Sequence, residues 1–201
     1  MKKKIAALVI TTGLLLTGCS QANQAASFGE NEITQSQLQD SIDSILAERA
    51  KVDTTSMNLQ TGQALTRGQL RFMILIQMYD EIAKELQLDV TSALVAEQRS
   101  NIIQSIGSEE NLPTSLVSAG IAPNDFDLYL RAITISNLIT AALINSGVPE
   151  AEVGNRVSEL LNAKSNELKI KINPRYGVWD STLGDIVDAD VPGKAVTPEV
   201  E

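Results

Sequence analysis

Few side chains in this sequence could carry out covalent chemistry. Among 201 residues there is one cysteine, Cys19, and no histidine. Without an imidazole, neither a Ser/His/Asp triad nor a histidine-based metal site can form. The sequence also lacks a glycine-rich phosphate loop with its lysine. We therefore expect a protein that binds rather than an enzyme, and we expect neither a cofactor nor a metal.

Three close pairs of carboxylates remain as candidates for acid–base chemistry. Each pair falls at the start of an expected helix, where the helix dipole favours negative charge. The sequence shows no apolar pocket around them that would shift a pKa. A structural role is therefore favoured over a catalytic one for all three pairs, which are Glu109 with Glu110, Asp125 with Asp127, and Glu150 with Glu152.

Cys19 lies directly behind a mostly apolar run. Residues 5–16 follow three lysines, and the run is shorter than the roughly 20 residues that a membrane-spanning helix needs. This pattern predicts that residues 1–18 are a secretory signal peptide. Leu16-Thr17-Gly18-Cys19 also matches the lipobox of bacterial lipoproteins, which implies cleavage before Cys19 and lipidation of its thiol. The alternative is that Cys19 is a free thiol that follows an uncleaved membrane anchor.

The charge of the chain limits its partners. Loss of residues 1–18 would remove three lysines and no acid, and the formal charge would change from −9 to −12. Nucleic acid and anionic lipid surfaces would repel such a chain. We therefore expect no nucleic acid partner, attachment to the membrane through lipid on Cys19, and a preference for neutral or basic ligands.

Hydrophobic periodicity indicates a mainly α protein with one helical domain. We expect a lipidated tether over residues 19–24, the domain over residues 25–180, and a disordered acidic tail over residues 181–201, which show no period. Capping boxes predict helix starts at Thr34 with Gln37 and at Thr66 with Gln69. Further helices are expected to begin at Thr91, Pro123 and Pro149.

The period changes to two over residues 168–172, which is typical of a half-buried strand. A lone strand leaves its backbone groups unsatisfied. The other strand candidate is residues 26–28, at the opposite end of the domain. We therefore expect a small two-stranded sheet that joins the N-terminal and C-terminal segments.

The order of these parts resembles the SurA N-terminal chaperone domain, and most closely its lipoprotein form in actinobacteria. The resemblance covers about residues 25–180 and is carried by the lipobox, the sequence Glu32-Ile33-Thr34, and the stretches ELQLDVTS (85–92), GIAPNDF (120–126) and NPRYGVWD (173–180). It implies a helical cradle that holds unfolded exported chains. Relatives often carry a parvulin prolyl isomerase domain, which is missing here because residues 144–149 join two helices directly.

The expected binding surface centres on one unusually apolar helix. From Leu70 to Tyr79 almost no polar face is present, so this helix is either buried on all sides or lines an apolar surface. For each of its large side chains taken singly, a place in the core is favoured. As a group they suggest an apolar groove, because methionine adapts to varied ligands. The groove candidates are Phe72, Met73, Ile76, Met78, Tyr79, Phe126 and Tyr129.

Two functions follow from these features. The first is an ATP-independent chaperone (holdase), anchored on the extracytoplasmic face of the cell membrane, that binds unfolded or extended segments of secreted proteins. The second is a non-catalytic envelope scaffold or adaptor that binds one specific folded partner.

For NPRYGVWD we favour a structural role, in which Tyr176 and Trp179 cover the small sheet and Arg175 lies near Asp180.

Overall fold

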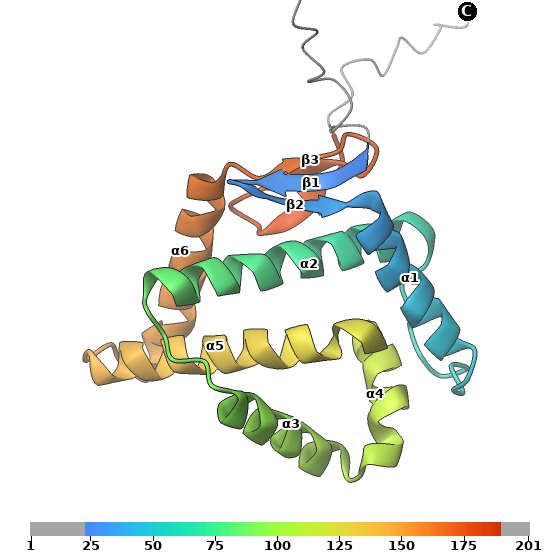
Figure 1. Ribbon diagram of the computed structural model, residues 1–201, viewed down its shortest axis with the longest axis horizontal. Helices are drawn as coiled ribbons and strands as arrows, with labels where there is room; N and C mark the ends of the chain where they lie inside the picture. Colours follow the sequence, from blue (N-terminus) through green and yellow to red (C-terminus); the bar gives the residue numbers. More distant parts are fainter. Residues whose placement is uncertain (1–22, 190–201) are drawn as a thin grey trace, which may run out of the picture.

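The computed structural model describes residues 23–189 and is mainly helical. In Figure 1 the elements form layers, with a small sheet above α2, then α5 beneath α2, and α3 beneath α5. Contacts between α2 and α5 and between α3 and α5 join these layers. The six α-helices of this region are α1 (Gln35–Arg49), α2 (Gly62–Glu85), α3 (Ser92–Ile106), α4 (Leu112–Ala119), α5 (Phe126–Asn145) and α6 (Glu150–Leu168).

The predicted helix starts are correct where the capping contacts are local. The Thr34 hydroxyl accepts from the backbone N–H of Gln37, and the Gln37 side chain accepts from the backbone N–H of Thr34, as a capping box requires. The Thr91 hydroxyl likewise accepts from the Leu94 backbone N–H at the start of α3. Gly120 takes the left-handed conformation that ends α4.

The second predicted capping box is wrong. Helix α2 begins at Gly62, one turn before Thr66, whose hydroxyl donates to the Gly62 carbonyl. Gln69 is buried inside the domain, where its side chain contacts Ser41 and the Gly120 carbonyl. Thr66 and Gln69 have the spacing of a capping box, but the Gln69 side chain makes tertiary contacts instead.

A three-stranded sheet joins the two ends of the domain. Strand β1 (Gln24–Phe28) lies between β2 (Asn31–Thr34) and β3 (Lys171–Ile172), antiparallel to both. The predicted pairing of the N-terminal and C-terminal segments is confirmed, with Ala26 opposite Ile172. The sheet has three strands rather than two, and β3 is shorter than predicted because α6 continues to Leu168.

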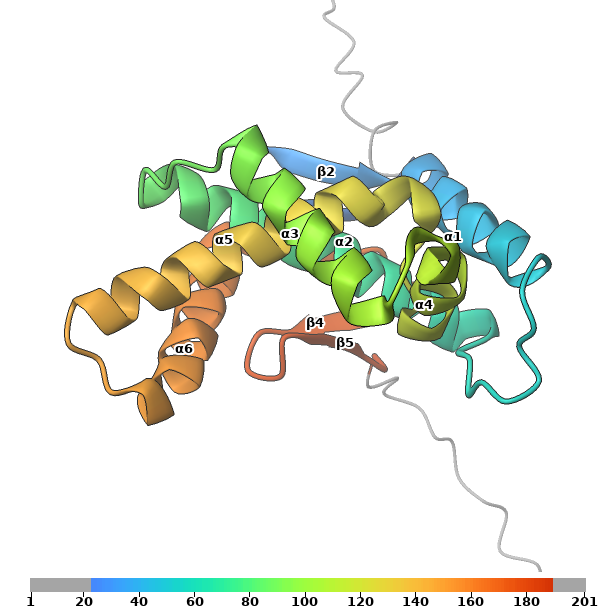
Figure 2. The ribbon, with the colours of Figure 1, turned by 90° about the horizontal axis from the view of Figure 1, so that it is seen from below.

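A second sheet corrects the predicted tail. Strands β4 (Val178–Asp180) and β5 (Asp185–Val187) form an antiparallel hairpin, with Trp179 opposite Ile186. Figure 2 shows this hairpin apart from α3 and α4. Residues 181–189 are therefore part of the fold, contrary to the prediction of a disordered tail from residue 181. The remainder of that tail, residues 190–201, lies outside the described residues, as do the predicted signal peptide and Cys19.

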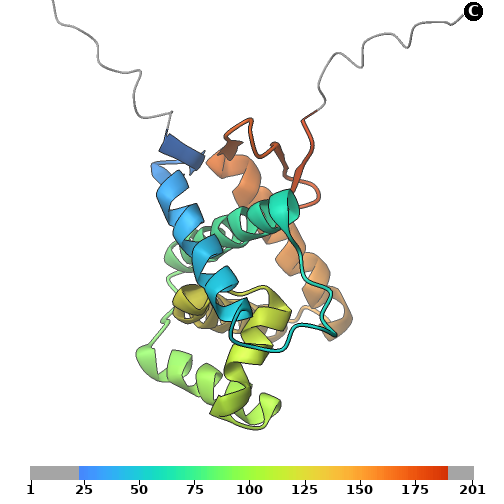
Figure 3. The same cartoon turned by 90° about the vertical axis from the view of Figure 1, so that its right-hand side faces the viewer.

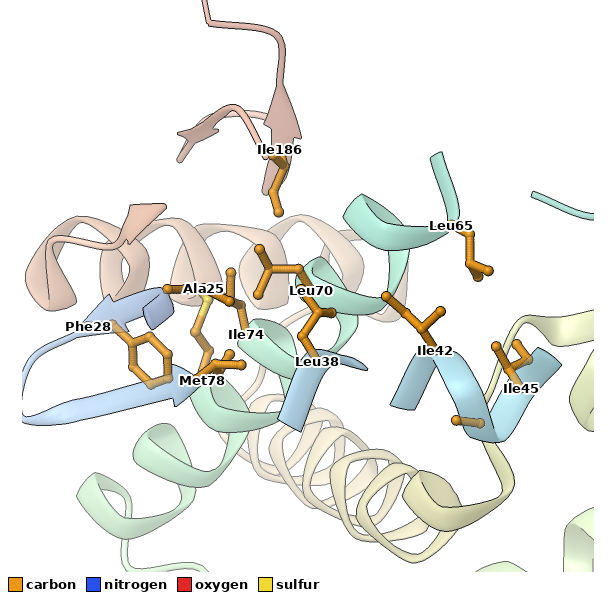
Figure 4. Packing of buried hydrophobic residues seen from close by; sticks show 13 residues of the cluster. Ala25, Phe28, Leu38, Ile42, Ile45, Leu65, Leu70, Ile74, Met78 and Ile186 are labelled. Carbon is orange, nitrogen blue, oxygen red and sulfur yellow. The ribbon is translucent and has the colours of Figure 1, made fainter. Parts of the chain in front are cut away.

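The hydrophobic core lies between the sheet, α1 and α2. Figure 3 shows both ends of the described chain at the same side of the molecule, and β1 and β5 bring these ends onto the same core. Figure 4 shows Met78 beside Ala25 and Phe28 in this cluster. Residues 23–189 thus bury a core of their own and pair their two ends, which are the contacts of an independently folding domain.

Helix α5 is the central helix of the lower half of the domain. The segment Pro123–Asn145 is long and apolar enough to cross a membrane by length and composition, and 28% of its most apolar window is buried. Ile135 and Ile139 are packed with Ile82 and Ala83 of α2. A core helix of a globular domain satisfies the same criteria, so one such helix is weak evidence for a membrane span.

Candidate binding groove

An apolar hollow of about 240 Å³ lies between α2 and α5. Its walls come from α2 and α5. Every lining side chain is aliphatic or aromatic except that of Ser136. The rings of Phe72 and Tyr129 are 6.3 Å apart between centroids. The full lining is Phe72, Leu75, Ile76, Tyr79, Tyr129, Ala132, Ile133 and Ser136.

Two further hollows adjoin the first along the same face of α2. One of about 440 Å³ shares Phe72 and Tyr129 with it and extends to the ends of α1 and α4. The other, of about 310 Å³, shares Leu75 and Tyr79 and extends to α6 and the β4–β5 hairpin. All three are half-open depressions rather than enclosed cavities. We call the three together the α2 groove.

The α2 groove has a regular basis in the sequence. Arg71, Phe72, Leu75 and Tyr79 contribute to these shared walls, and their spacing of one, three and four residues places them on one face of an α-helix. The opposite face of α2 carries Leu70 and Ile74 into the core. The apolar stretch of α2 is longer than packing against the core requires. A second apolar face therefore remains to line the groove.

The structure brings only part of the predicted groove together. Four of the seven candidates line the apolar hollow: Phe72, Ile76, Tyr79 and Tyr129. Met78 is 1% exposed and belongs to the core, although it also borders the hollow beside α6. Met73 packs against the same core, and Phe126 is buried in a separate cluster with Leu116, Ile121 and Leu130.

The structure also reveals groove residues that the sequence did not single out. Leu75, Ala132 and Ile133 complete the apolar hollow, and Arg49 and Arg71 line the largest hollow. Periodicity could indicate that Leu75 and Ile133 are apolar, but not that they face each other. Arg49 is the last residue of α1. No pattern in the sequence predicts that it lies near α2.

Two arginines are the only charged residues in the lining of the α2 groove, within the part of the chain that the structure describes. Arg49 donates from Nη1 to the Gln60 carbonyl at 2.7 Å, whereas its buried Nε has no hydrogen-bond partner. Burial lowers the pKa of the Arg49 guanidinium. Arg71 donates from Nε to the Gly184 carbonyl at 2.8 Å and lies 3.5 Å from Asp185 Oδ1.

Among the predicted carboxylate pairs, Asp125 and Glu109 make structural contacts. Asp125 is buried and lies 2.6 Å from the Ser41 hydroxyl, which connects α5 to α1. Glu109 pairs with Arg99, and Glu150 and Glu152 lie in the first turn of α6. Within residues 23–189 no group of three or more Asp, Glu, Cys or His side chains could hold a metal ion.

The segment NPRYGVWD packs onto the core. Tyr176 and Trp179 are partly buried against it, and the Trp179 indole donates to the Ser165 hydroxyl at 2.5 Å. Arg175 donates to the Gln35 side chain and lies over the Tyr176 ring, whereas Asp180 accepts from the backbone of its own turn. These contacts agree with a structural role, and the described contacts of Arg175 and Asp180 are with other residues rather than with each other.

Comparison of the chain with protein-family models, with curated proteins and with solved structures gives no match. The resemblance to the SurA N-terminal chaperone domain therefore stays a prediction.

Proposed function

We propose that this protein is an ATP-independent holdase that binds extended, apolar segments of unfolded polypeptides in the α2 groove. The observation that supports this proposal most strongly is that three half-open hollows share lining residues along α2. A half-open groove accepts an extended chain, whereas small-molecule sites bury most of their ligand's surface.

The lining of the groove suits apolar side chains without requiring one sequence. Phe72, Tyr79 and Tyr129 offer aromatic area, and Leu75, Ile76 and Ile133 offer aliphatic area. Because binding an unfolded chain restricts its conformational freedom, each site should bind weakly. Lipid on Cys19 would place the groove at the membrane surface, where exported chains emerge.

The adaptor function is the second candidate, and one observation favours it. The two methionines of α2 that would make the surface adaptable lie against the core instead. The groove presents tyrosine and arginine, the residue types that anchor specific interfaces. An adaptor would bind one folded partner and ignore unrelated unfolded chains.

An aggregation assay tests the proposal. Residues 20–201 should slow the aggregation of heat-unfolded citrate synthase without ATP, and should show no prolyl isomerase activity on a proline peptide. Leu75→Ala, in the groove, should weaken protection, while Leu46→Ala should not, because Leu46 is 46% exposed on α1 and lies outside the groove. Absence of protection by the wild type at a several-fold molar excess would leave the adaptor as the better account.

A further inference from the structure

The charge inside the α2 groove is opposite to the charge of the whole chain. Acidic residues outnumber basic ones, 25 to 16, yet the described lining of the three hollows contains Arg49 and Arg71 and no carboxylate. A concave site lined by one sign of charge concentrates its potential. The net charge of the chain therefore does not predict the charge that surrounds a segment bound in the groove.

Arg49 has unused capacity to bind an anion. Its one described hydrogen bond goes to a backbone carbonyl, its Nε is buried without an acceptor, and no salt bridge to it exists among residues 23–189. Burial of an unpaired guanidinium is unfavourable, as the lowered pKa of Arg49 also indicates. A carboxylate in this hollow would offset that cost by pairing with the Nη groups of Arg49, which make only the one described hydrogen bond.

Arg71 lies where the polar and apolar parts of the groove meet. It neighbours Phe72, which lines both the hollow that contains Arg49 and the apolar hollow. Its contact to Gly184 uses Nε alone, and the exposed Asp185, at 3.5 Å from Nε, neutralises it only in part. The two Nη groups of Arg71 remain able to donate to a bound carboxylate.

Building on the proposed function, we propose that the α2 groove prefers extended segments in which an acidic side chain lies a few residues from a run of apolar ones. The carboxylate occupies the hollow lined by Arg49 and Arg71, and the apolar side chains occupy the hollow between α2 and α5. The partner is thus an unfolded polypeptide of apolar and acidic composition.

Three fluorescent peptides of twelve residues test this preference with residues 20–201. Each carries the same central run Leu-Phe-Ile, flanked at three residues on both sides by Asp, Asn or Lys. We expect the Asp peptide to bind about three- to tenfold more tightly than the Asn peptide, since charged pairs of this kind contribute modestly. The Lys peptide should bind most weakly, and added salt should reduce these differences.

Protein variants separate the groove from the rest of the surface. Arg49→Gln and Arg71→Gln should each reduce the difference between the Asp and Asn peptides while leaving binding of the Asn peptide nearly unchanged. Arg156→Gln is the matched control, because it removes the same charge from the exposed face of α6. Asp185→Asn removes the acidic neighbour of Arg71, keeps the Arg71 contact to the Gly184 carbonyl, and should strengthen the preference.

The outcomes distinguish this inference from the proposed function. Equal binding of the three peptides, or a preference for Asp that survives in both arginine variants, overturns the inference and leaves the holdase proposal standing. Failure of all three peptides to bind overturns both. A dimer that dissociates in Arg49→Gln would assign the groove to a second copy of the chain and would also overturn the inference.

Discussion

The ring of Phe72 on α2 lies 6.3 Å from the ring of Tyr129 on α5, and the two form a wall shared by two hollows of the α2 groove. Tyr129 also stacks near Phe126, at 6.4 Å between ring centroids. Phe126 is buried, whereas Phe72 and Tyr129 keep part of their surface in solvent. The pair thus connects the core of the domain to the surface that we propose for binding.

Truncation of this wall should weaken binding and should cost less stability than truncation in the core, because both rings are only partly buried against the cluster around Phe126. We expect Phe72→Ala and Tyr129→Ala each to weaken binding of an unfolded chain by about 2 kcal/mol, as for an aromatic anchor. Ile74→Ala and Met78→Ser should instead lower the free energy of unfolding by about 2–5 kcal/mol, because both side chains are at most 1% exposed. Urea unfolding and fluorescence anisotropy measure the two effects separately.

The β4–β5 hairpin should contribute to stability. Ile186 is 6% exposed in the main core, and Asp188 pairs with Arg67 of α2. Truncation after Asp180 removes both contacts and should cost about 2–5 kcal/mol, the range for losing a buried aliphatic side chain. Truncation after Ala189 keeps both contacts and serves as the control. Equal melting temperatures for the two truncated chains would contradict a structural role for β5.

Lys164 should make stability depend on alkaline pH. Its side chain is 8% exposed and donates to Glu167 and Glu85, which connects α6 to α2. These hydrogen bonds, first to Glu167 and then to Glu85, raise the pKa of Lys164 above its ordinary value of 10.5. The stabilisation is therefore complete below about pH 10.5 and is lost as the pH rises through the higher pKa of the folded state.

The variant Lys164→Met keeps most of the volume and removes the charge. Denaturant unfolding between pH 8 and pH 12 should show a steeper loss of stability in the wild type than in this variant. Parallel curves would show that the Lys164 pairs contribute nothing measurable to folding.

Cys19 should determine where the protein is found. The intact protein should fractionate with membranes and carry acyl chains, whereas Cys19→Ser should lack lipid, because the thiol is the acceptor in the lipobox interpretation. Mass spectrometry of both forms measures this directly. Acyl chains on the Ser variant, with unchanged fractionation, would disprove that interpretation.

Local signals in the sequence predicted the helices well. Thr34 with Gln37 and Thr91 with Leu94 interact within one turn, so the sequence contains everything needed to infer them. Thr66 with Gln69 has the same spacing, but the buried Ser41 and the Gly120 carbonyl bind that glutamine. Contacts between distant segments overrode the local pattern there.

The strands and the groove also depend on contacts between distant segments, which limited their prediction from the sequence. The alternation over residues 168–172 correctly indicated a strand, but only Lys171 and Ile172 pair with β1, because Lys169 adopts a left-handed conformation at the end of α6. Strand β5 is three residues long and too short for a visible period. Helical spacing alone could not separate Ile76, which lines the apolar hollow, from Met73, which packs against the core and lines none of the three hollows.

Site-specific photocrosslinking tests the central proposal most directly. A benzoylphenylalanine at position 72 faces the α2 groove, and one at position 46 lies on an exposed part of α1 outside it. With residues 20–201 and an unfolded, radiolabelled polypeptide, we expect strong crosslinking from position 72, little from position 46, and loss of the signal when the polypeptide is folded. Equal yields from the two positions, or crosslinking only to one folded partner, would contradict the account.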